Sequence, residues 1–353
     1  MIRTKYAGLL FAMLVPALYA AHARHPRSNQ PAADSQPITL NVVVDSQSGQ
    51  PVTNLTQSDF QLFDNKSPSK ITSFKAVSGT QNPVSVILFL DAVNMDYDRS
   101  AKVRQGVNKF LMANGGKLPY PTTIAVFGDD GLHISPSSSN AVDLTATLAD
   151  YQVSLRNLSR STQYGRSALI NLSLSAFGQI LAYAQKLPGR KLIICVSPGW
   201  PILSGPGLFL SWQEQNQIFS NVVLFSTQLR KEGVTLYDIN PEGVSGSQLW
   251  NVYYQSFLNG PAKPGKAAFG DLALPVLAVQ SGGSVIETNR SIARYIQQCL
   301  MDGESWYEIG MDPAASGKPN QYHHLVLKLT RPGLNARTNV VYYSDPQYSA
   351  QPR

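Results

Sequence analysis

A run of apolar residues that ends abruptly in a carboxylate opens the central part of the chain. Six of the eight residues from Val84 to Asp91 are apolar, and a polar turn follows them. An uninterrupted apolar run of this length is typical of a parallel strand whose two faces are both covered by helices. Parallel sheets bind their ligands at the carboxyl ends of the strands. The loop after Asp91 is therefore a candidate functional site.

Strand-like and helix-like patterns alternate after this strand. Val103, Val107 and Phe110 recur at helical spacing, and Asp98 or Ser100 is expected to cap that helix. The remaining pattern predicts strands at 122–127, 191–196, 234–239 and 285–286, a strand at 131–135 antiparallel to the first of these, and helical segments at 141–152, 168–187, 218–233, 272–278 and around Cys299. This alternation predicts an α/β, doubly wound, mostly parallel sheet.

Both ends of the region that is expected to fold have β character. Short alternating segments occur at 38–44, 51–55, 59–65 and 71–74, and again at 306–309, 324–329 and 336–343. Neither set has enough strands for a core, so we expect them to form one small β-sandwich in which the α/β domain is inserted. The predicted parts are a signal peptide (1–23), a linker (24–36), an N-terminal β segment (37–80), the α/β domain (81–304), a C-terminal β segment (305–345) and a tail (346–353).

The first residues predict export to the periplasm or the extracellular space. Arg3 and Lys5 precede an apolar core at 7–18, and Ala21-His22-Ala23 is a small-x-small cleavage pattern. A membrane anchor is the alternative, but the apolar core is shorter than the roughly 20 residues that a spanning helix needs. We therefore expect no membrane span after the signal peptide is removed.

The charge distribution argues against nucleic-acid binding, and the positions of the cysteines indicate buried thiols. The formal net charge is +7, and the basic residues are interpreted as dispersed surface charges without the aromatic interleaving of a nucleic-acid site. The two cysteines, Cys195 and Cys299, fall at apolar positions and are expected to be buried thiols. A disulfide between them remains the alternative, because an exported protein meets an oxidising compartment.

Several segments together resemble the bacterial group of proteins related to von Willebrand factor type A domains. They are the strand ending in Asp91, Gly165-Arg-Ser167-Ala-Leu, Leu187-Pro-Gly-Arg-Lys-Leu-Ile-Ile and Ser281-Gly-Gly before a strand. The leading and closing β segments resemble that group as well, in Pro51-Val, Asp59-Phe, Asp64-Asn65, Arg331-Pro-Gly-Leu and Tyr342-Tyr343. The resemblance covers nearly the whole mature chain and implies the same α/β fold.

The resemblance also implies the position of a metal site, but this sequence lacks most of the oxygen ligands of the family pattern. The family pattern is Asp-x-Ser-x-Ser in the first loop, a Thr in the second and an Asp in the third, all oxygen ligands suited to Mg²⁺. Here the first loop reads Asp91-Ala-Val93-Asn94-Met95, Ser167 stands at the second-loop position, and the third-loop position after Ser197 is Pro198. We expect no bound metal or other cofactor unless Asn94 or Asp96 rearranges, and we interpret Asp91 as a carboxylate that caps a helix or bonds its own loop.

Aromatic residues occupy the segments that follow the other strand ends. Trp200 follows the strand at 191–196, and Trp250, Tyr253 and Tyr254 follow the strand at 234–239. We hypothesise that they form a contact surface for a protein or cell-surface ligand, together with Asp91, Asn94, Asp96, Ser167 and Ser197, because Trp and Tyr are enriched in interfaces. The alternative is that these aromatics pack inward as a lid on their own loops.

Catalysis has little support in the sequence. No nucleophile elbow, phosphate-binding loop or His-Glu-x-x-His pattern occurs. His323 and His324 are adjacent on a predicted strand, so their side chains point to opposite faces. The sequence therefore favours an exported, non-enzymatic binding or adhesion-type protein. A metal-assisted or serine-type envelope hydrolase, with a polar pocket near Asp91, Asp96 and Ser197, and a purely structural envelope component remain alternatives.

Overall fold

The structure is a computed structural model that describes residues 37–128, 130–149, 163–200, 209–243, 253–288, 291–314 and 318–347, without the side chains of 163, 164, 166 and 167. The predicted signal peptide and linker lie outside the described residues.

A mixed sheet with a parallel centre organises the described residues. Its order is β11-β10-β9-β5-β6-β7, and β8 pairs with β6 beside this path. The bounds are β5 (Val84–Asp91), β6 (Lys117–Gly128), β7 (Gly131–Ile134), β8 (Ser138–Asn140), β9 (Arg190–Val196), β10 (Val234–Asn240) and β11 (Val285–Glu287). The pairings from β11 through β6 are parallel, and β7 is antiparallel to β6, as the sequence predicts. Every residue of β5 and β9 is buried, which explains their uninterrupted apolar patterns.

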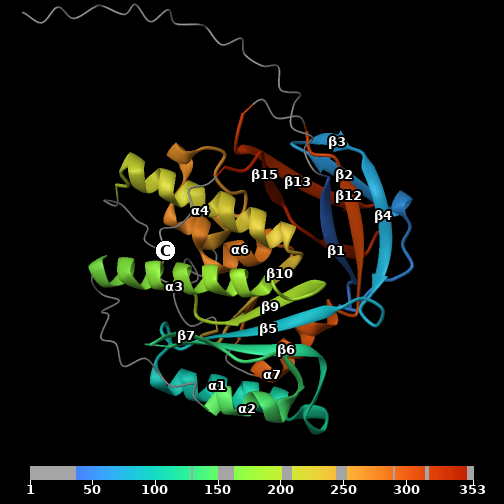
Figure 1. Cartoon of the computed structure of the whole chain (residues 1–353). Helices are drawn as coiled ribbons and strands as arrows, with labels where there is room; N and C mark the ends of the chain where they lie inside the picture. Colours follow the sequence, from blue (N-terminus) through green and yellow to red (C-terminus); the bar gives the residue numbers. More distant parts are fainter. Residues whose placement is uncertain are drawn as a thin grey trace, which may run out of the picture. The chain divides into compact units, whose positions relative to one another are not determined.

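Helices cover both faces of this sheet (Figure 1). The helices are α1 (Tyr97–Leu111), α2 (Ala141–Ala149), α3 (Gln163–Ala184), α4 (Trp212–Lys231), α6 (Leu274–Gln280) and α7 (Ile292–Met301). One apolar core joins the sheet to α3, α4 and α6, and a second joins it to α1, α2 and α7. The predicted doubly wound, mostly parallel α/β fold is confirmed. Short 3₁₀ helices lie between these elements: η1 (Gln57–Asp59), η2 (Ala113–Gly116), η3 (Tyr254–Phe257), η4 (Pro264–Lys266) and η5 (Phe269–Leu272).

The remaining strands form two antiparallel sheets, each of which combines strands from both ends of the chain. One has the order β14-β1-β12-β4 and the other β15-β13-β2-β3. The bounds are β1 (Ile38–Ser46), β2 (Phe60–Asp64), β3 (Ser67–Ser69), β4 (Ile71–Ser78), β12 (Ser305–Met311), β13 (Gln321–Leu329), β14 (Leu334–Arg337) and β15 (Val341–Ser344). A third apolar core lies between them, in which the Phe60 ring centroid is 5.2 Å from that of Tyr307. The predicted sandwich from N- and C-terminal strands is therefore confirmed.

Three local expectations were wrong. The segment 336–343 is not one strand, because the chain leaves β14 at Arg337 and joins the other sheet in β15. The sequence keeps strand-like residues through this crossing, so periodicity alone does not reveal it. The segment 51–55 forms only one bridge, between Asp45 and Pro51. The cap of α1 is Asp96, whose side chain accepts a hydrogen bond from the Arg99 backbone amide at 2.9 Å.

Arg337 joins the sandwich to the α/β part. Its guanidinium donates to both carboxylate oxygens of Asp302 at 2.9 and 2.8 Å and to Asp45 at 2.9 Å. Asp302 follows α7, and its backbone carbonyl accepts a hydrogen bond from the buried Arg190 of β9. The Arg190 guanidinium also lies 5.0 Å from the ring centroid of Trp306, in the sandwich strand β12. Charged and aromatic side chains therefore fix the sandwich against one end of the central sheet.

Candidate functional site

The carboxyl end of β5 carries a buried carboxylate that bonds its own loop. Asp91 is 1% exposed, and its Oδ1 accepts a hydrogen bond from the Asn94 backbone amide at 3.0 Å. Its Oδ2 accepts from the Asn94 side-chain amide at 2.9 Å and from the Ser197 hydroxyl at 2.7 Å. This geometry agrees with the interpretation of Asp91 as a loop-bonding carboxylate.

The same network extends from β5 to the neighbouring elements. The Asn94 amide also donates to the Ser173 hydroxyl of α3 at 2.9 Å, and the Gly199 amide donates to the Ser197 hydroxyl. Asn94, Ser173 and Ser197 are each at most 2% exposed. The sequence analysis named Asn94 and Ser197 but missed Ser173, because the helical pattern gives no sign of which polar residue faces the loop.

The residues present do not fit the metal site that the family pattern implies. Val93 and Met95, at the two first-loop hydroxyl positions, are apolar and buried. Both oxygens of Asp91 already accept hydrogen bonds, and Asp96 caps α1 instead of facing Asp91. Among the described residues, no group of three or more His, Cys, Asp or Glu side chains could hold a metal ion. The Ser167 side chain lies outside the described part of the chain.

A second buried carboxyl lies on β10, on the opposite side of β9 from β5. Asp238 is 3% exposed and is paired in register with Cys195 of β9. Burial raises the pKa of Asp238 well above its usual value, and the charges of Glu287 and Asp91 raise it further. Its Oδ1 has no hydrogen-bond partner within the described residues. Burial at this position therefore disfavours the charged form of the Asp238 carboxyl group.

Both thiols are buried and free, as the favoured interpretation predicts. Burial raises the pKa of Cys195 and of Cys299 well above the usual thiol value. Because the thiolate is the reactive form of cysteine, neither residue is suited to nucleophilic chemistry.

Trp200 packs inward. It is 5% exposed, its indole nitrogen donates to the Leu272 carbonyl at 2.9 Å, and its ring lies 6.1 Å from that of Phe177 in α3. This is the arrangement expected of the lid alternative. Tyr253 and Tyr254 are half-buried, with the Tyr253 ring edge-on to Phe257 at 5.2 Å, and Trp250 lies outside the described residues.

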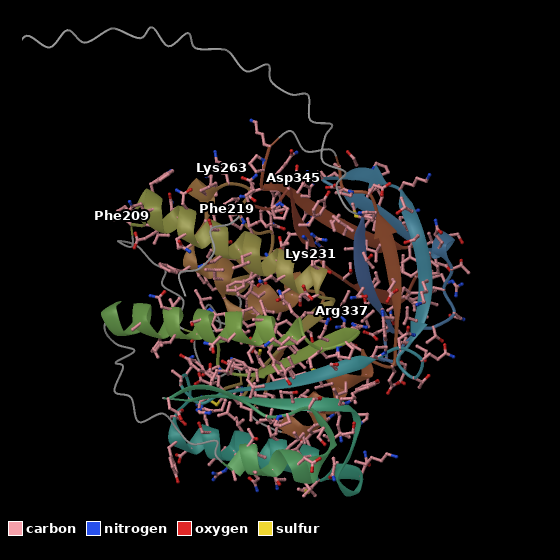
Figure 2. All side chains as sticks on the ribbon, viewed as in Figure 1. Phe209, Phe219, Lys231, Lys263, Arg337 and Asp345 are labelled. Carbon is pink, nitrogen blue, oxygen red and sulfur yellow. The ribbon has the colours of Figure 1, made fainter. Side chains whose placement is uncertain are left out.

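Among the described residues, the aromatic side chains with the largest exposed fractions at this edge are not those that the sequence indicated. Phe209 is 90% exposed and Trp212 is 73% exposed, at the start of α4 after the carboxyl end of β9. Figure 2 shows Phe209 at the end of α4 that lies away from the sandwich. Tyr97, the first residue of α1 after β5, is 73% exposed. The sequence does not reveal the exposure of these three aromatic residues, because their exposure depends on where α1 and α4 begin and not on a periodic pattern.

A buried polar cluster in the sandwich was also missed. His323 of β13 lies with Nδ1 2.9 Å from Asp64 Oδ1 of β2, and the Tyr342 hydroxyl donates to Asp64 Oδ2 at 2.6 Å. Burial raises the pKa of Asp64, but hydrogen bonds from His323 and Tyr342 and the His323 charge outweigh it, so this pKa is lowered. Only strand pairing brings these residues together, since 259 positions separate Asp64 from His323.

Within the described residues, no helix has the length and apolar character needed to cross a lipid bilayer. No family model matches the sequence. No curated protein matches it either.

Solved structures provide the remaining comparisons. The chain is similar to an aerotolerance-related membrane protein of Bacteroides fragilis, at 16% identity over 63% of this chain and 98% of that one, with a TM-score of 0.33. It is similar to the VWA domain of SpRpn10, at 11% identity over 62% of this chain and 96% of that one, with a TM-score of 0.32. It is also similar to the pilus adhesin SpaC of Lactobacillus rhamnosus GG, at 10% identity over 82% of this chain and about half (48%) of that one, with a TM-score of 0.36.

Proposed function

We propose that this protein is an exported, non-enzymatic binding protein that recognises another protein at the carboxyl edge of its central sheet. The exposure of Phe209 and Trp212, at 90% and 73%, carries this proposal. The proposed export rests on the sequence pattern of residues 1–23.

The position of these aromatics supports a contact surface. Tyr97, Phe209 and Trp212 begin the helices that follow two adjacent parallel strands, β5 and β9, so they share the sheet edge where such folds bind partners. Fully burying a large apolar side chain contributes about 1.5–3 kcal/mol, which remains available to a partner when the side chain is exposed in the free protein. Aromatic anchors of this kind dominate the binding energy of many protein interfaces.

The buried groups nearby support recognition without chemistry. A hydrolase would need Asp91 and Ser197 to face a substrate, whereas both are at most 1% exposed and bonded to each other. The sandwich contains a Ser-His-Asp line as well, with Ser344 Oγ 3.3 Å from His323 Nε2. Ser344 and His323 are 5% and 2% exposed, and the Ser344 hydroxyl also donates to a backbone carbonyl. That line is better suited to bonding three strands together than to attacking a substrate.

The double variant Phe209→Ala/Trp212→Ala tests the proposal. The chain from residue 24 onward is immobilised and exposed to envelope extract, and the retained proteins are quantified by mass spectrometry. Val142→Ala/Met112→Ala is the matched control, because those side chains are also exposed (67% and 46%) but lie on α2 and after α1. Truncation of exposed side chains changes stability by no more than about 0.5 kcal/mol, so both variants should melt like the wild type.

We expect at least one protein to be retained by the wild type and the control and to lose most of its retention on the Phe209→Ala/Trp212→Ala surface. Equal retention on all three surfaces would refute the role of this aromatic pair. Retention of no protein by the wild type would instead favour a purely structural component of the envelope.

A further inference from the structure

Helix α1 carries a concentration of positive charge, although the basic residues look dispersed along the sequence. Its 15 residues contain Arg99, Lys102, Arg104 and Lys109, against the single carboxylate of Asp98. Lys102 and Lys109 are seven positions apart, so they lie on the same side of the helix, about 10 Å apart along its axis. Both are exposed.

These two lysines line a cleft between α1 and α7. The cleft has a volume of about 510 Å³, and its lining includes Lys102, Gln105 and Lys109 of α1 and Ser291, Ile292 and Ala293 at the start of α7. This volume lies within the roughly 300–1,000 Å³ that is usual for small-molecule sites. Among the described residues, the lining of this cleft contains cationic side chains and no carboxylate.

A glycine explains why the two helices form walls around a cleft. A Cβ atom on Gly106 would lie 2.9 Å from the Ile292 Cβ, closer than such atoms approach. Helices α1 and α7 therefore approach each other closely at Gly106. Lys102 and Lys109 lie about one helical turn before and after Gly106, and their longer side chains line the cleft on either side of this close contact.

The charges in the cleft have unequal roles. Arg99 is neutralised by Glu242, with its guanidinium 2.7 Å from the Glu242 carboxylate. No ion pair or hydrogen bond of the Lys102 or Lys109 ammonium group occurs within the described part of the chain. The first amides of α7, at Ile292 and Ala293, have no carbonyl partner inside the helix and carry its positive dipole end. Concave walls of one sign concentrate the field and attract a ligand of the opposite sign.

We propose that the cleft between α1 and α7 binds a small polyvalent anion whose phosphate or carboxylate groups contact Lys102 and Lys109. The spacing of the two positions, about 10 Å along the helix axis, favours a ligand with at least two anionic groups over a single small ion. Helices α1 and α7 share an apolar core that does not include α4, so this site is distinct from Phe209 and Trp212 at the start of α4.

Titration calorimetry with tripolyphosphate and with citrate tests the proposal, on the chain from residue 24 onward in low salt. The test variant is Lys102→Gln/Lys109→Gln. The matched control is Arg104→Gln, which removes a positive charge from the same helix but lines the separate cleft between α1 and α2. All three side chains are exposed, so circular dichroism should show the same fold and melting in each protein.

We expect saturable binding of at least one probe to the wild type, at least tenfold weaker binding to Lys102→Gln/Lys109→Gln, and less than a threefold change for Arg104→Gln. Tighter binding of tripolyphosphate would identify a phosphate ligand, and tighter binding of citrate a carboxylate ligand. Absence of saturable binding by both probes, or equal weakening by Arg104→Gln, would overturn the proposal. Phe209→Ala/Trp212→Ala should leave anion binding unchanged, which separates this result from the test of the aromatic surface.

Discussion

At the scale of single residues, the buried carboxylate of Asp91 bonds the loop that follows β5. Its carboxylate accepts hydrogen bonds from the Asn94 amide, the Asn94 side chain and the Ser197 hydroxyl. A buried donor that loses its acceptor costs about 1–3 kcal/mol of stability. The network therefore holds the loop after β5 against β9.

We predict that Asp91→Ala lowers the free energy of unfolding by about 3 kcal/mol, because it leaves buried donors on Asn94 and Ser197 unpaired. Urea denaturation followed by circular dichroism measures this. Asp96→Ala is the control: it removes the cap of α1 and an exposed ion pair with Arg99, and it should cost about 1 kcal/mol. Equal costs for the two variants would contradict the network as the main role of Asp91.

At the scale of an element, the short helix η5 carries a carboxyl group whose burial affects folding. Asp271 is 4% exposed and accepts a hydrogen bond from the Ala268 amide at 2.8 Å. Burial raises its pKa to about 6, although the Ala268 bond opposes the shift. The next residue, Leu272, accepts the hydrogen bond of the Trp200 indole. The helix that fixes Trp200 inward therefore contains a proton-sensitive group.

The sign of the pH effect follows from this raised pKa. The neutral form of Asp271 suits the folded state, so its contribution is fully present below the unfolded pKa near 3.8 and is lost as pH rises through about 6. We predict that Asp271→Asn becomes more stable than the wild type by about 2–3 kcal/mol above pH 6, and that the difference disappears near pH 4. Urea unfolding from pH 4 to pH 7 measures it, with the exposed Asp98→Asn as the control. A constant difference across this range would rule out titration of Asp271 as the cause.

At the scale of the whole molecule, a largely buried ion cluster joins the β-sandwich to the α/β part. The Arg337 guanidinium lies between Asp302 and Asp45, whose side chains are 7% and 18% exposed. Burial lowers the pKa of Arg337. The charge of Asp302 and the hydrogen bonds to both carboxylates raise this pKa by more than burial lowers it, so Arg337 stays charged. Removing one partner of such a cluster leaves an unpaired buried charge.

We predict that Arg337→Ala destabilises the protein by about 3–5 kcal/mol, because the carboxylates of Asp302 and Asp45 lose the guanidinium that bonds both of them. Arg331→Ala is the comparison, since Arg331 is 43% exposed and pairs with Asp59 inside the sandwich, where a loss of less than about 1 kcal/mol is expected. Arg337→Lys should recover only part of the loss, because lysine lacks the planar fork that contacts both carboxylates. Calorimetric unfolding of the three variants distinguishes these outcomes, and a similar loss in Arg331→Ala and Arg337→Ala would argue against the ion cluster as the joint.

The pattern of apolar residues determined the architecture of the central sheet. Strands such as Val84–Asp91 and Arg190–Val196 are buried on both faces, so their sequences have no alternation and can be identified without a structure. The alternating flanks likewise contained enough information to assign a sandwich. The sequence of the first loop after Asp91 also shows apolar residues, Val93 and Met95, at the positions where the pattern that it resembles has hydroxyl groups.

Contacts between distant segments were decided only by the tertiary structure. Whether Trp200 faces solvent or the core depends on the Leu272 carbonyl, 72 positions away, and the pairing of Asp64 with His323 depends on the register of β2 against β13. The cleft between α1 and α7 likewise requires Gly106 to meet Ile292. The periodicity of apolar residues in the sequence indicates which face of a helix or strand is apolar, but it does not indicate which other element covers that face. For this reason the fold followed from the sequence, whereas the exposed aromatics and the basic cleft did not.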